Sequence, residues 1–120
     1  MPEAPRRRPD DAVVLHSFSG HVKARPKAVF DALDRRFRPQ EGSRSLYTAD
    51  PAAFLIIAQG GWWYRGEYRV VPDESGSNVE HVMLNIAQQR RMSGSAGRRV
   101  VDDAPADFGR LMKELRIDLE

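Results

Sequence analysis

The chain contains three histidines, the residues best suited to metal binding or to acid–base chemistry near neutral pH. His16 and His21 are five residues apart in a segment patterned like a strand, and a regular strand directs them to opposite faces. A metal would need further ligands, and the chain has no cysteine to supply them. We therefore expect neither a metal site nor a cofactor. His81 is expected on the outer face of a sheet, opposite Arg69.

No short catalytic motif is present in the sequence. Serine, histidine and aspartate all occur, but the Gly-x-Ser-x-Gly elbow and the glycine-rich phosphate loop do not. A triad assembled across the fold stays open, since its members need not be adjacent in sequence. Tyr64, Tyr68 and Glu80 are the candidates for acid or base chemistry. Glu80 is expected on the inward sheet face but near a turn, where it would reach solvent, and no residue is predicted to be catalytic.

Aromatic and aliphatic side chains form the stronger candidate for a binding site. Ligand pockets are mostly apolar with a few polar anchors, and a buried tyrosine hydroxyl needs a partner, so Tyr64 and Tyr68 are the expected anchors. The predicted ligand-binding residues are Phe18, Phe54, Trp62, Tyr64, Tyr68, Glu80, Phe108, Met112 and Leu115. In the simpler interpretation, these side chains fill the core of a small domain and leave no void.

Hydrophobic patterning predicts the elements that must position these residues. Strands are expected over residues 12–24, 44–49, 53–59, 62–72 and 78–88. The first strand is expected to be long and bent, because its apolar face switches near residues 17–20. A helix is expected to begin at Pro26 and to end at Phe37, before Arg38 and Pro39.

The last two strands predict a hairpin. A three-residue loop with Gly76 in the left-handed conformation would pair Tyr68 with Val82 and Tyr64 with Ile86. This register places the apolar faces of both strands on the same side of the sheet, which is independent support for the pairing.

A mobile loop is predicted over residues 89–103, which are rich in glycine, serine and arginine. Within this loop, Arg90, Arg91, Arg98 and Arg99 flank the part that contains the glycine and serine residues. A second helix is expected to begin at Pro105, because apolar residues recur at helical spacing after it. Its apolar stripe consists of Phe108, Leu111, Met112, Leu115 and Leu119.

The composition sets the class of protein. The chain has 120 residues, of which 19 are basic and 17 acidic, and its formal net charge of +2 argues against nucleic acid as a partner. No apolar run approaches the ~20 residues that a membrane helix needs. Because there is no cysteine, a disulfide framework is excluded, and we expect a cytoplasmic protein. We expect a flexible tail over residues 1–11 and a single domain over residues 12–120.

Two segments resemble START-like domains, the SRPBCC superfamily. Residues 21–33 (HVKARPKAVFDAL) resemble the opening of these domains, and residues 64–87 (YRGEYRVVPDESGSNVEHVMLNIA) resemble their late hairpin. The closing helix agrees in position, so the resemblance covers roughly residues 14–119. It implies an α+β helix-grip fold, in which a curved antiparallel sheet of about five strands packs on a C-terminal amphipathic helix. It also implies an apolar pocket between the sheet and that helix. Compared with full-length members of the superfamily, this chain has one hairpin fewer.

These patterns lead to one functional hypothesis and two alternatives. The first is a domain that binds a small hydrophobic ligand or partner between the sheet and the C-terminal helix, without catalysis. The second is a cyclase- or dehydratase-like enzyme that uses a polar pair inside the pocket, marked by a buried group with a perturbed pKa. The third is a homodimer without a ligand, formed through Trp63 and Met83 on the outer sheet face.

Overall fold

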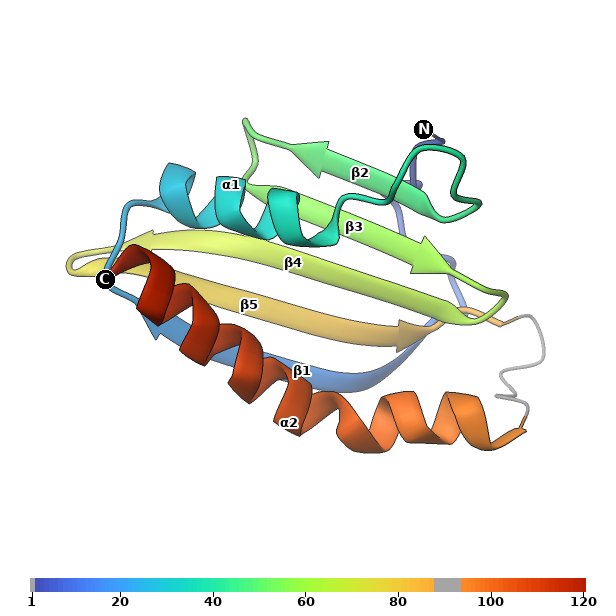
Figure 1. The fold of residues 1–120 in the computed structure, drawn as a ribbon. Helices are drawn as coiled ribbons and strands as arrows, with labels where there is room; N and C mark the ends of the chain where they lie inside the picture. The colour runs from blue at the N-terminus through green and yellow to red at the C-terminus, as the bar shows by residue number, and fades with distance from the viewer. Residues whose placement is uncertain (1, 88–93) are drawn as a thin grey trace.

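The computed structural model describes residues 2–87 and 94–120, and has an α+β fold with both helices on one face of an antiparallel sheet (Figure 1). The strands are β1 (Val13–Val22), β2 (Leu46–Asp50), β3 (Leu55–Gly60), β4 (Tyr64–Asp73) and β5 (Gly76–Asn85). The helices are α1 (Pro26–Phe37) and α2 (Gly94–Leu119). The five strands lie in the order β1-β5-β4-β3-β2. The predicted fold class is confirmed: a five-stranded sheet, a short helix after the first strand and a long C-terminal helix on the sheet.

Helix α1 begins and ends where the sequence predicts. Pro26 is its first residue, a position at which the missing N–H has no intrahelical partner in any case. Its apolar stripe, Val29, Phe30 and Leu33, is buried against the sheet. The helix ends before Arg38, because a residue that precedes proline disfavours the helical conformation.

Strand β1 bends earlier than predicted. The register shifts between Val14 and His16, so the irregularity lies near residue 15 and the predicted bend at residues 17–20 is wrong. The even-numbered residues that follow face the helices. Gly20 has a packing role instead, since a Cβ at this position would lie 2.7 Å from Cε of Met112. The glycine therefore lets α2 approach the strand closely.

The predicted hairpin exists, but its predicted register is wrong by one residue. Tyr68 pairs with His81, and Asp73 pairs with Gly76 across a two-residue turn. The loop is therefore one residue shorter than predicted. The Asp73 carboxylate stabilises it by accepting a hydrogen bond of 2.9 Å from the Ser75 amide. A slip of one residue exchanges the two faces of a strand. Consequently His81 faces the helices, and Glu80 is exposed on the opposite face.

Helix α2 begins eleven residues before the predicted start, at Gly94 rather than Pro105. The loop prediction is therefore wrong for residues 94–103, and Arg90 and Arg91 lie outside the described residues. Pro105 stands inside the helix and has no N–H to donate to the Val101 carbonyl one turn earlier. Nε2 of His16 lies 2.8 Å from that carbonyl oxygen and takes the place of the missing donor.

The core lies between the sheet and the two helices. Residues that contribute to it include Val22, Val29, Leu33, Tyr47, Ile56, Val79 and Leu115. This packing covers one face of the sheet, the face on which the candidate site is found. No helix among residues 2–87 and 94–120 is long and apolar enough to cross a membrane.

The N-terminal segment, residues 2–8, crosses the other face of the sheet. Arg65 of β4 is fully buried beneath it and donates hydrogen bonds to the carbonyl oxygens of Pro5 (2.7 Å) and Arg6 (3.0 Å). Arg8 forms a two-pronged ion pair with Glu67. Most of the segment predicted as a tail thus lies against β2–β4. The flexibility predicted for residues 1–11 stays a prediction.

Candidate ligand-binding site

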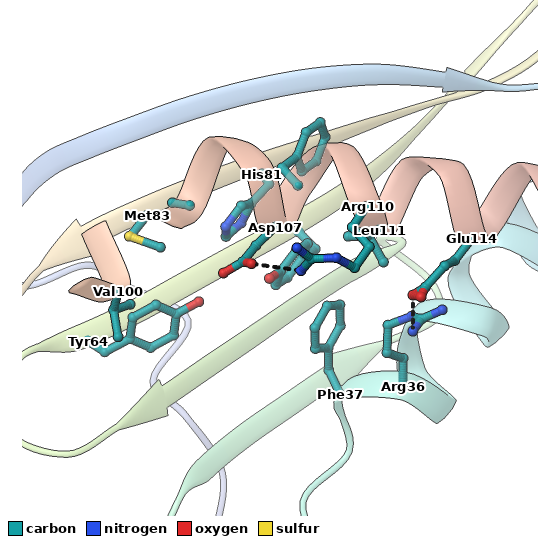
Figure 2. Close-up of a pocket in the computed structure, with 13 residues that line it drawn as sticks. Arg36, Phe37, Tyr64, His81, Met83, Val100, Asp107, Arg110, Leu111 and Glu114 are labelled. Carbon is teal, nitrogen blue, oxygen red and sulfur yellow. Dashed lines mark hydrogen bonds and ion pairs between the residues drawn. The ribbon is translucent and has the colours of Figure 1, made fainter. Parts of the chain in front are cut away.

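A pocket of about 330 Å³ lies over β4 and β5, between the C-terminal end of α1 and the middle of α2 (Figure 2). The residues that line it are Arg36, Phe37, Tyr64, Tyr68, His81, Met83, Val100, Ala104, Asp107, Phe108, Arg110, Leu111 and Glu114. Its walls are mainly aromatic and aliphatic, and the charged residues come from the two helices. This composition is typical of a site for a small organic molecule.

A row of stacked rings forms the floor of the pocket. The Tyr68 and His81 rings lie nearly parallel, with centroids 4.1 Å apart and an interplanar angle of 4°. Phe37 stacks on Tyr68 at 4.5 Å, and Phe18 and Phe108 extend the row beyond His81. The register of the hairpin creates this arrangement, since it places Tyr68 directly opposite His81. The stack holds the imidazole in one orientation.

Tyr64 lies flat along the sheet because Gly66 has no side chain. A Cβ at Gly66 would collide with the Tyr64 hydroxyl group. The phenol ring therefore passes over the glycine, and its hydroxyl points towards the centre of the pocket (Figure 2). There it interacts with the hydroxyl of Tyr68. An aromatic ring over a strand glycine also shields the backbone there.

His81 is a neutral hydrogen-bond acceptor at the surface of the pocket. His81 is only 4% exposed, and this burial lowers the pKa of its imidazole. The hydrogen bond to the Glu67 carbonyl raises the pKa in part, whereas nearby His16 lowers it. Nδ1 lies 3.1 Å from the Glu67 carbonyl oxygen, to which it must donate. The neutral ring then has no proton on Nε2. Nε2 has no hydrogen-bond partner among the described residues. Every side-chain nitrogen or oxygen of those residues that is fully buried does have a partner, so Nε2 must be accessible from the pocket.

The two tyrosines are neutral donors in the same pocket. Burial raises the pKa of both hydroxyls. Their mutual interaction lowers the pKa of Tyr64 and raises that of Tyr68, as expected when Tyr68 donates to Tyr64. The Asp107 charge raises the pKa of Tyr68 further. Both phenols therefore keep their protons at neutral pH.

The charged residues at the rim neutralise one another. Asp107 and Arg110 of α2 form an ion pair of 2.9 Å, and Arg36 of α1 pairs with Glu114 of α2 at 3.0 Å. Both pairs are drawn in Figure 2. The second pair joins the two helices across the mouth of the pocket.

Three of the nine predicted binding residues line the pocket: Tyr64, Tyr68 and Phe108. Phe18 lies behind Phe108, with ring centroids 5.1 Å apart. The others lie elsewhere: Met112 and Leu115 in the core, Phe54 against Phe30, Trp62 at the tip of a hairpin with 52% of its surface exposed, and Glu80 on the outer face. Placing Glu80 on the inward face is thus wrong.

Several lining residues were missed by sequence reasoning. His81 and Met83 were assigned to the outer face, and the correct hairpin register would have placed both inside. Met83 is buried in the pocket, so it cannot contribute to the predicted dimer surface. Val100 falls in the segment 89–103 that was predicted as a loop, and Ala104 lies just before the predicted start of the helix at Pro105.

Comparison with known proteins adds no relative. No protein-family model and no curated protein sequence matches this chain. The proposals that follow rest on the fold and on the geometry of the pocket.

Proposed function

We propose that this chain is a small START-like domain that binds a small hydrophobic ligand between its sheet and α2, without catalysis. The pocket of about 330 Å³ over Tyr64, Tyr68 and His81 is the observation that carries the proposal. Ligand pockets have volumes of roughly 300–1,000 Å³, so this one suits a compact molecule. The sheet and its two helices agree with the arrangement that the START-like resemblance implies.

Two observations favour a binding pocket over a completely filled core. Tyr64, Tyr68 and His81 all line the open space although they are largely buried, and their polar groups are therefore within reach of a ligand. Val100, an apolar residue of α2, is 41% exposed at the same pocket. An apolar ligand would cover it and gain about 25 cal/mol for each Å² removed from water.

The experiment fills the pocket with a side chain. Val100→Trp introduces an indole at the pocket, whereas Ile117→Trp introduces the same group on the same helix at a residue that is 70% exposed and outside the pocket. We expect naphthalene, titrated by NMR, to bind the wild type and Ile117→Trp alike and to bind Val100→Trp at least about tenfold more weakly. Equal binding to both variants, or no binding to the wild type, would reject the proposed site.

A second candidate function, acid–base catalysis, has its own support. The neutral Nε2 of His81 and the Tyr64 hydroxyl lie in one pocket, which is the combination of a base and an acid that enolisation requires. Nε2 would remove a proton from the carbon beside a carbonyl group, and the hydroxyl would donate a hydrogen bond to the resulting enolate. Deuterium exchange into 2-tetralone tests this function: the wild type should exceed His81→Gln, and equal rates would exclude it.

A further inference from the structure

We propose that the ligand of this pocket is a neutral alcohol or phenol whose hydroxyl group donates a hydrogen bond to Nε2 of His81. This inference rests on the proposed function, because it specifies the ligand class of the same site. It selects against two other classes of apolar ligand, carboxylic acids and molecules without a hydrogen-bond donor.

His81 offers the pocket a hydrogen-bond acceptor and no donor. Its Nδ1 is committed as a donor to the Glu67 carbonyl, 3.1 Å away, so the neutral ring offers only an acceptor to the pocket. A pocket-lining acceptor without a partner loses its hydrogen bond to water when an apolar molecule displaces that water. A ligand with an O–H group restores the bond, whereas an ether or a hydrocarbon does not.

Neighbouring rings fix the direction of this acceptor. The His81 ring is stacked on Tyr68 at 4.1 Å and has Phe18 and Phe108 beside it, with centroids 5.9 and 6.1 Å away. A ring held on its neighbours and by its Nδ1 bond loses little freedom when a ligand binds. Such preorganisation increases the selectivity that one hydrogen bond can give.

The charges around the pocket disfavour anionic ligands. A carboxylate needs an available cation, and both arginines that the described residues place at the pocket already have carboxylate partners, Arg36 with Glu114 and Arg110 with Asp107. Asp107 also brings a negative charge close enough to raise the pKa of Tyr68. A carboxylate ligand would be repelled there, whereas a neutral hydroxyl would not.

The experiment compares three naphthalenes that share one ring system. 2-Naphthol has a donor, 2-methoxynaphthalene has an oxygen without a donor, and 2-naphthoate is an anion. Each is titrated against the wild type and His81→Phe, which retains a ring for the stack but has no acceptor. We expect the substitution to weaken 2-naphthol about five- to tenfold and to leave 2-methoxynaphthalene within about twofold. 2-Naphthoate should bind the wild type most weakly of the three.

A second measurement needs no variant. In the ¹⁵N NMR spectrum of the wild type, the Nε2 resonance of His81 should move upfield when 2-naphthol is added, because the nitrogen accepts the O–H proton, and it should not move upfield with 2-methoxynaphthalene. An unchanged Nε2 resonance while 2-naphthol binds, an equal effect of His81→Phe on both neutral probes, or a preference for 2-naphthoate would overturn the hydroxyl inference alone. Absence of binding by all three probes would overturn the proposed function together with it.

Discussion

Gly66 determines the shape of the pocket because the ring of Tyr64 occupies the space above it. Any Cβ at this position meets the Tyr64 hydroxyl end of the ring, so the ring must move if the glycine is replaced. The helical Gly109 is a useful contrast, because a Cβ there would meet no atom within 4 Å. The two glycines therefore separate a packing effect from a backbone effect.

We expect Gly66→Ala to destabilise the fold by about 1–3 kcal/mol, as overpacking does, and to weaken naphthalene binding by displacing Tyr64. Gly109→Ala should instead stabilise the protein by up to about 1 kcal/mol, since alanine favours a helix over glycine. Urea unfolding measures both changes. A neutral Gly66→Ala with unchanged binding would contradict the position of the Tyr64 ring.

His81 makes stability depend on pH. Burial lowers the pKa of its imidazole in the folded state, whereas in the unfolded chain the pKa is about 6.5. The unfolded state therefore binds a proton more readily, and stability is lost as the pH falls below about 6.5 until the folded state also titrates. This window lies above the range in which ordinary carboxylates titrate.

The measurement is the urea midpoint of the wild type at about pH 7.5 and about pH 5.5. We expect a lower midpoint at the lower pH, and a smaller difference in His81→Phe, which cannot be protonated. His21→Gln is the control for a histidine near the surface, where the ring contacts Asp73. Identical pH dependence in the wild type and His81→Phe would show that burial of His81 does not cause the effect.

At the scale of single elements, α2 continues through Pro105 because β1 supplies the missing donor. The Val101 carbonyl, which cannot bond to residue 105, receives Nε2–H of His16 instead. The donor comes from a residue 85 positions earlier in the chain. The contact therefore ties the proline-containing region of the helix to the neighbouring strand.

A double-mutant cycle tests this compensation. His16→Phe should cost about 1 kcal/mol in the wild type, where it leaves the Val101 carbonyl without its donor. In a Pro105→Ala background the same substitution should cost clearly less, because the backbone amide of the introduced alanine can bond to that carbonyl. Urea unfolding of the four proteins gives the coupling energy. Equal costs of His16→Phe in both backgrounds would refute the compensation.

Local signals determined how far the sequence could predict these elements. Proline at both ends defined α1, and alternation located β4, whereas the faces of β5 were ambiguous. Both sides of β5 hold buried apolar residues, Val79 and Met83 towards the helices and Leu84 on the other side, so hydrophobicity alone could not fix the register. That ambiguity removed His81 from the predicted site. The start of α2 was missed because its proline is accommodated by a distant histidine.

At the scale of the whole molecule, the N-terminal segment covers the sheet face opposite the pocket. Ala4 is buried, its carbonyl accepts a hydrogen bond of 2.7 Å from the Thr48 hydroxyl, and Arg65 is covered completely. A buried guanidinium needs nearly all its donors satisfied, and the carbonyls of the segment supply part of that requirement. The segment therefore stabilises the sheet as well as covering it.

Two neighbouring arginines provide a matched test of this contribution. Arg8→Ala removes a two-pronged pair with Glu67 and should cost about 1 kcal/mol. Arg7→Ala removes only the ion pair between Arg7 and Asp10, in which both side chains are exposed to solvent. It should change the unfolding free energy by less than about 0.5 kcal/mol. Urea unfolding compares them. Equal effects of the two substitutions would mean that the segment does not hold the sheet through Arg8.

The contacts of the N-terminal segment also impose an order on biosynthesis. Residues 2–8 leave the ribosome before β2, β3 and β4, yet these strands form the surface on which the segment lies. β1 likewise has to await β5, the strand with which it pairs in the sheet. Contacts between residues so far apart in sequence slow folding. Residues 2–8 and β1 therefore stay without their sheet partners until the β4–β5 hairpin has emerged, and during that interval a chaperone could bind the apolar side chains of β1.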